Sequence, residues 1–362
     1  MLSSITLRRN GSYQFELLVL SIFMRLRHLI FVILVGFLGL ASPTTSGQTN
    51  QDAPIKVQTT LVNVPVIVSD RLGRYVSGLT LNDFKLYEDR IEQRIAICES
   101  TEEPINVALL LDTSHSTTPV LDDIKKEATS FLKELRPQDR ALVMSFDYDL
   151  HLLSPLTSDR KKMERAIKDA TIGERLGTVL RDAVADIIEH QFERVDGRKA
   201  IILLTDGKDF GSRVSEEALL DEATESGAMI YSVFFETGPQ HRNRQDRRDR
   251  PRTGWGRRGR FPLAGQMGGQ RRQRVEMRNA EAREFLTDLS DVSAGRFYSS
   301  DVSDLQKTFK LVAEELRHQY RLGFYPDGAK ADGLRHTLRV EVDTPGAVVR
   351  ARRSYQATSL TH

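Results

Sequence analysis

The chain has 362 residues, of which 40% are apolar and 28% charged, a mixture that excludes a disordered or a membrane-embedded protein. The formal net charge of +2 hides an asymmetry, because the segment 241–280 holds 13 Arg, no Lys and three acidic residues. The rest of the chain is therefore acidic. A single cysteine, Cys98, excludes an intrachain disulfide.

The N-terminal region has the order of a secretory signal peptide. Two arginines follow Met24, an apolar run extends over 29–41, and small and polar residues come next. This run is shorter than the about 20 apolar residues that a membrane span needs. We expect a signal peptide over 1–47, or over 24–47 if Met24 is the start. The protein would be exported to the periplasm, the cell surface or the medium, with no transmembrane span in the mature chain; an uncleaved anchor is the alternative.

Residues 52–101 form the first predicted structural segment, and their pattern is that of β-strands. "KVQTTLVNVPVIVSD" is rich in Val and Thr, and "DFKLYED" and "QRIAICE" are shorter strand candidates separated by turn residues. This segment contains no group of residues typical of a catalytic site.

Residues 102–319 alternate between strands and helices. Continuous apolar runs such as "INVALLLD" and "RKAIILLTD" are typical of parallel strands buried on both faces. Stretches such as "VLDDIKKEATSFLKEL" and "DLQKTFKLVAEELRHQ" have apolar residues at helical spacing. Repeated strand–helix units predict an α/β fold with a doubly wound, mostly parallel sheet.

The pattern becomes β again over 320–358, with "YRLGFYP", "LRHTLRVEVD" and "VVRARRSYQ" as strand candidates. Sheets of two or three strands are marginal alone. We therefore expect these strands to pack with those of 52–101 into a β-sandwich that flanks the α/β domain.

One segment of the α/β region, 238–279, departs from this pattern. It is rich in Gly and Arg, has no apolar period, and is predicted to be a disordered insertion. It leaves from the carboxyl end of the predicted strand "MIYSVFFET", so it should emerge at the edge where the other strands end.

Three predicted strand–helix junctions carry oxygen-bearing side chains. "DTSHS" supplies Asp112, Ser114 and Ser116, "LGT" supplies Thr178, and "LLTDG" supplies Asp206. In an open parallel sheet the carboxyl ends of the strands share one edge, where ligands bind at a topological switch point. These five side chains can therefore converge.

The chemistry of this set favours a hard divalent cation. It contains two carboxylates and three hydroxyls, with no Cys and no matched His, which argues against zinc. Mg²⁺ takes few protein carboxylates and keeps several waters, one of which a ligand can replace. We expect Mg²⁺, or Mn²⁺ or Ca²⁺ in its place, bound by Asp112, Ser114, Ser116, Thr178 and Asp206.

These motifs resemble the metal-ion-dependent adhesion site (MIDAS) of von Willebrand factor type A domains, with Asp-x-Ser-x-Ser, a Thr and an Asp on three loops. The resemblance covers 105–319, and the flanks look like exported von Willebrand A-related proteins that abound in acidobacteria. It implies a Rossmann-like fold and a metal-dependent adhesion or protein-binding module. The partner would be a protein whose acidic residue completes the metal coordination.

Other interpretations of the same residues stay open. Asp112 and Thr178 could be loop and cap residues only, and the Arg-rich segment could bind an anionic polymer or an acidic partner by charge. Specific nucleic-acid binding is not expected of an exported chain. A metal-dependent hydrolase is a distant alternative, because no second acid follows Asp112 at the spacing of phosphotransferases and no G-x-S-x-G or Walker motif is found. We therefore expect no enzymatic activity and no catalytic residue.

Overall fold

The computed structural model describes residues 61–100, 102–237, 263–326 and 333–357. The predicted signal peptide over 1–47 lies outside these residues. Within the described ranges, no helix combines the length and the apolar character that a membrane span requires.

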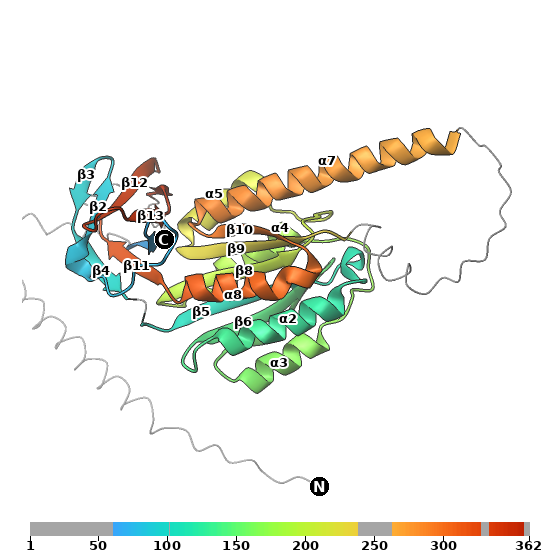
Figure 1. Cartoon of the computed structure of the whole chain (residues 1–362), viewed down its shortest axis with the longest axis horizontal. Helices are drawn as coiled ribbons and strands as arrows, with labels where there is room; N and C mark the ends of the chain where they lie inside the picture. Colours follow the sequence, from blue (N-terminus) through green and yellow to red (C-terminus); the bar gives the residue numbers. More distant parts are fainter. Residues whose placement is uncertain (1–60, 101, 238–262, 327–332, 358–362) are drawn as a thin grey trace, which may run out of the picture. The chain divides into compact units, whose positions relative to one another are not determined.

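A six-stranded sheet forms the centre of the α/β region (Figure 1). Its strand order is β10-β9-β8-β5-β6-β7, and all neighbouring strands are parallel except β6 and β7. The strands are β5 (Ile105–Asp112), β6 (Arg140–Phe146), β7 (Leu150–Thr157), β8 (Arg198–Thr205), β9 (Ala228–Phe235) and β10 (Arg296–Ser300).

The two faces of this sheet are covered by different helices (Figure 1). One face packs against α2 (Leu121–Glu134), α3 (Arg160–Asp169) and α8 (Leu305–Leu316). The other packs against α4 (Leu180–Asp186), α5 (Glu216–Glu225) and α7 (Leu263–Val292). Since β5 is buried along its whole length, its continuous apolar run is explained by burial on both faces. The predicted doubly wound α/β fold is confirmed.

Two four-stranded sheets lie beside the α/β region, in the orders β13-β1-β11-β4 and β14-β12-β2-β3. In the first sheet, strands from the two ends of the chain alternate, so that β1 pairs antiparallel with both β11 and β13. In the second sheet, the two ends of the chain meet where β2 pairs with β12. The strands are β1 (Val62–Ser69), β2 (Phe84–Glu88), β3 (Ile91–Gln93), β4 (Ile95–Glu99), β11 (Gln319–Phe324), β12 (Arg335–Val342), β13 (Val348–Ala351) and β14 (Ser354–Gln356).

The two small sheets share one apolar core. Val64, Val66 and Leu322 of the first sheet pack in the same cluster as Leu86 and Val340 of the second. The predicted flanking β-sandwich of N- and C-terminal strands is thereby confirmed.

The sandwich is fixed to the edge of the six-stranded sheet at which its parallel strands begin. Arg198, the first residue of β8, is 1% exposed and donates from Nη1 to the carbonyl of Gln319 at 2.7 Å. Only Arg317 and His318 separate α8 from β11, so the chain enters the sandwich directly from this edge. The carboxyl ends of the strands lie at the opposite edge of the sheet.

One local expectation from the sequence is wrong, and one strand was not predicted. The segment 238–279 is not irregular throughout, because α7 begins at Leu263 and continues through Asn279. Its residues 271–278 include Arg, Gln, Glu and Met, all strong helix formers, and the apolar residues that anchor the helix come later. Strand β7 was also missed, because Pro155 interrupts its pattern; Pro is tolerated there because β7 is an edge strand.

Candidate functional site

Asp112 and Asp206 lie at the point where the winding of the sheet reverses. Asp112 is the last residue of β5, and Asp206 follows the last residue of the adjacent strand β8. The chain continues from β5 to β6 on one side, while β8 lies on the other side. This is the topological switch point at which open α/β sheets bind ligands.

The carboxyl group of Asp112 is fully buried and contacts only neutral donors among the described residues. It accepts hydrogen bonds from the Ser114 backbone N–H at 3.0 Å and from Thr205 Oγ1 at 2.7 Å. Burial, and next the negative charge of Asp206, raise the pKa of Asp112 to about 7. An ionised Asp112 would therefore gain from any cation placed between the two carboxyl groups.

The two serines of "DTSHS" turn toward each other. Ser114 Oγ and Ser116 Oγ are 3.1 Å apart, and the loop is closed by Thr117 Oγ1, which donates to the carbonyl of Ser114 at 2.8 Å. Ser114 is buried and Ser116 half-buried, whereas His115 between them is exposed. Alternate residues thus place two hydroxyl oxygens together beside Asp112, and the intervening His115 is exposed to solvent.

Thr178 lies on a loop that is joined to both of the others. Its carbonyl accepts from the Phe210 N–H at 2.9 Å, and Gly173 of the same loop donates to the carbonyl of Thr113 at 3.1 Å. Thr178 is 3% exposed, and it does not cap α4, whose N-cap is Val179 with no side-chain cap. The alternative that Thr178 serves only as a helix cap is therefore wrong.

Asp206 has a different environment from Asp112. Its Oδ2 contacts Lys208 Nζ and accepts from Thr237 Oγ1, and Lys208 Nζ also donates to Thr237 Oγ1 at 2.9 Å. The lysine side chain is 29% exposed, so it can leave this position without crossing the core. One of the two carboxylates is thus paired with a cation that belongs to the chain itself.

Sequence reasoning missed the contributions of Thr205, Lys208 and Thr237. Thr205 connects the two strands, because its hydroxyl donates to Asp112 and accepts from the Gly207 N–H at 2.9 Å. Thr205 and Lys208 flank Asp206 in "LLTDGKD", so their proximity was visible in the sequence, but the direction of their side chains was not. Thr237 gave no signal, since it follows β9 with no motif.

Nearby acids have structural partners instead. Asp147 is buried, and its Oδ2 lies 3.0 Å from His151 Nε2 and 3.4 Å from Thr113 Oγ1. Asp209 accepts from the Arg181 N–H at 3.0 Å and from Ser212 Oγ at 2.6 Å, and it therefore stabilises a turn at the start of α4.

The five predicted residues fit a hard divalent cation by their chemistry. Two buried carboxylates lie at neighbouring strand ends, Asp112 has no cationic partner in the described residues, and hydroxyl oxygens gather on the adjoining loop. No group of three or more His, Cys, Asp and Glu side chains that could hold a metal occurs in the described part of the chain. A site of two carboxylates and three hydroxyls does not need one.

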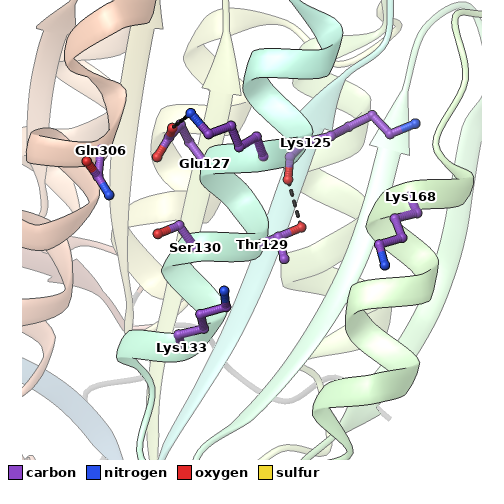
Figure 2. Close-up of a pocket in the computed structure, with 8 residues that line it drawn as sticks. Lys125, Glu127, Thr129, Ser130, Lys133, Lys168 and Gln306 are labelled. Atoms are coloured by element: carbon purple, nitrogen blue, oxygen red, sulfur yellow. Dashed lines mark hydrogen bonds and ion pairs between the residues drawn. The ribbon is translucent and has the colours of Figure 1, made fainter.

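A separate groove of about 360 Å³ lies in the helical layer formed by α2, α3 and α8 (Figure 2). Lys133 and Lys168 are among the four lysines that line it, together with Glu127, which pairs with Lys126 at 3.3 Å. Its walls are helix surfaces rather than strand ends, so this groove is distinct from the Asp112 site.

Comparisons with known proteins agree with this architecture. Residues 107–208 match the family model of the von Willebrand factor type A domain. No curated protein matches the chain.

Several solved structures are similar to this chain at low identity. Proximal thread matrix protein 1 of the mussel byssus, solved with a zinc-occupied MIDAS motif, is 15% identical, with coverage of 63% of this chain and 49% of that chain and a TM-score of 0.44. This chain thus spans about half the length of the mussel protein. The von Willebrand factor domain of the type V pili tip protein Mfa5 from Porphyromonas gingivalis is 13% identical, with coverage of 58% and 94% and a TM-score of 0.41. BatB from Bacteroides thetaiotaomicron is 19% identical, with coverage of 59% and 97% and a TM-score of 0.40.

The matched segment 107–208 includes β5, β6 and β8, and with them the first two loops of the site and Asp206. The chain therefore contains a von Willebrand factor type A domain.

Proposed function

We propose that the protein is an exported, non-enzymatic binding module that holds Mg²⁺, or another hard divalent cation, with Asp112, Ser114, Ser116, Thr178 and Asp206. A carboxylate of a protein ligand would complete the coordination of the metal.

One observation carries this proposal: the fully buried carboxyl group of Asp112 lies beside a second carboxylate and has no cationic partner in the described residues. Buried charges are ordinarily paired or bound to metals. The arrangement costs stability unless a cation occupies it, so it is better explained by binding than by folding.

Calorimetric titration with MgCl₂ and MnCl₂ tests the proposal. The wild type should bind one divalent ion, and ion at about 100 times the Kd should stabilise the fold by about 2.7 kcal/mol. Asp112→Ala should lose both responses. Asp149→Ala is the matched control, because Asp149 lies near the same edge but its side chain is 55% exposed and pairs with Arg175.

A wild type that shows neither heat of binding nor a shift in Tm with either ion would end the proposal. A charge-driven binder that uses the Arg-rich segment is the second candidate, supported by the exposed Arg274 and Arg278 of α7. Its binding would survive chelator and disappear at moderate salt.

A further inference from the structure

Exposed apolar side chains surround the carboxyl edge of the six-stranded sheet. Tyr148, Leu176 and Phe210 are 38%, 79% and 57% exposed, and each comes from a different loop. These are the loops that follow β6, precede α4 and follow β8, so they also carry or adjoin Asp147, Thr178 and Asp206. Large apolar side chains gathered around a polar centre are typical of protein-binding surfaces.

Helix α7 continues past this same edge. Near its end it lies at the opposite, amino edge, where the Ile230 N–H donates to Ser293 Oγ at 2.9 Å. Closer to its N-terminus, at Ala282, α7 lies at the carboxyl edge. Ala282 is so close to Gly207, which follows β8, that a Cβ added to Gly207 would lie 2.7 Å from the Cβ of Ala282. The part of α7 from Leu263 to Ala282 therefore extends beyond the metal-bearing edge by about 28 Å, at 1.5 Å per residue.

The extension presents arginines along the side that faces this edge. Arg274, Arg278 and Ala282 are spaced four residues apart and form one stripe of the helix. Ala282 packs beside Gly207, and the guanidinium of Arg278 lies 5.7 Å from the centre of the Phe210 ring. Glu276 is two residues from Arg274 and Arg278, and it therefore projects from the other side of the helix.

The described residues supply no counter-charge for this stripe. Among the described residues, neither Arg274 nor Arg278 forms an ion pair, whereas Arg283, one turn further, contacts Glu236 at 2.5 Å. Val275 and Met277 are 43% and 63% exposed, so these two apolar side chains of the extension are largely uncovered by the described residues.

We infer that Arg274 and Arg278, together with Phe210, Leu176 and Tyr148, form a docking surface for an acidic polypeptide segment that also carries apolar side chains. The inference rests on the proposed function, since one carboxylate of that segment would reach the metal while further carboxylates pair with the arginines. Charge complementarity selects an acidic occupant. The apolar rim selects a polypeptide rather than an anionic polysaccharide, because a polysaccharide would leave the three exposed side chains uncovered.

A fluorescein-labelled random copolymer of glutamate and tyrosine is a suitable probe, with titrations of the full chain followed by fluorescence anisotropy in Mg²⁺ and in EDTA. The double variant Arg274→Gln/Arg278→Gln should bind the copolymer about fivefold to tenfold more weakly in both conditions, since two exposed ion pairs are lost. Phe210→Ser should weaken binding in both conditions by about threefold.

The control is Lys133→Gln/Lys168→Gln, which removes the same charge from the groove of Figure 2 on the other helical layer. It should bind the copolymer as the wild type does. All substituted side chains lie at the surface, and unfolding curves verify that each variant is folded. The inference is overturned if the α7 variant binds like the wild type, if the groove variant loses as much affinity, or if heparin binds more tightly than the copolymer and depends on the same arginines.

The same titrations separate this inference from the proposed function. If Mg²⁺ does not strengthen copolymer binding to the wild type, the metal site fails as a contact for the acidic segment. The effects of the arginine and Phe210 substitutions in EDTA would still test the docking surface independently of the metal.

Discussion

The two edges of the six-stranded sheet each hold a fully buried carboxylate, but only one of the two carboxylates has cationic partners among the described residues. At the amino edge, Glu315 of α8 contacts Arg350 of the sandwich, lies 3.4 Å from an Arg296 nitrogen, and accepts from Tyr75 Oη at 3.1 Å. At the carboxyl edge, Asp112 has two neutral donors and a neighbouring carboxylate.

We interpret this difference as one between a structural carboxylate, Glu315, and a candidate binding carboxylate, Asp112, in the same domain. The charge of Glu315 is balanced by residues of the chain, and it joins the helix to the sandwich. The charge of Asp112 is balanced by no cation among the described residues. Burial alone therefore does not mark a site, but burial without a counter-charge does.

The largest expected effect tests the amino edge. Glu315→Ala leaves Arg350 and Arg296 without their carboxylate and should lower the free energy of unfolding by about 4 kcal/mol, as for other broken buried ion pairs. Urea unfolding measures it. Glu314→Ala is the control, because Glu314 is half exposed and pairs with Arg317 at the surface, so its loss should cost less than about 1 kcal/mol. Equal effects of the two substitutions would show that the Glu315 network does not fix the sandwich.

A smaller effect of opposite sign is expected at the carboxyl edge. The folded pKa of Asp112, about 7, lies above the ordinary aspartate pKa of about 3.9, so the folded state binds an additional proton between these pH values. In EDTA the wild type should therefore lose stability as the pH rises from 4 to 8. Asp112→Asn removes this loss and should be more stable than the wild type at pH 8, by at most about 4 kcal/mol, since each pKa unit corresponds to about 1.4 kcal/mol.

Unfolding curves of both proteins in EDTA at pH 5 and pH 8 check this prediction. The difference between them should be smaller at pH 5 than at pH 8. If Asp112→Asn were less stable than the wild type at pH 8, the ionised Asp112 carboxylate would not be destabilising in the folded protein.

The smallest effect concerns the cation that the chain itself supplies. Lys208 Nζ contacts Asp206 and would have to leave it before a metal could bind there. Lys208→Met should therefore tighten Mg²⁺ binding about tenfold by calorimetry, equivalent to about 1.4 kcal/mol. Lys168→Met, in the groove of the other layer, should leave the affinity unchanged. An unchanged or weaker affinity in Lys208→Met would assign that lysine a supporting role in the site.

The sequence predicted the parts of this molecule that depend on local pattern. The apolar runs of β5 and β8 identified buried parallel strands, and the rule that such strands end at one edge brought Asp112 and Asp206 together. The sequence also indicated that the strands from the two ends of the chain would pack together, because small sheets are marginally stable alone.

Features that depend on side-chain direction or on distant partners were not predictable. The pairing of Glu315 with Arg350 joins residues on a helix and on a sandwich strand, and no spacing rule relates them. The start of α7 was missed because its first part has the composition of a disordered segment and no apolar stripe. Its helical form depends on the anchored residues that follow, such as Leu286 and Leu289.

The pairing of β1 with β11 has a consequence for how the molecule folds. Val62 lies opposite Phe324, so this ladder can close only after the whole intervening α/β region has been brought into a compact form. Closing so long a loop from an extended chain is slow, and contacts of high sequence separation form late. We expect the α/β region to organise first and to act as the template on which the sandwich assembles. During synthesis, β1, β2 and β4 must wait for the C-terminal strands with which they pair, whereas β3 already has its partner β2.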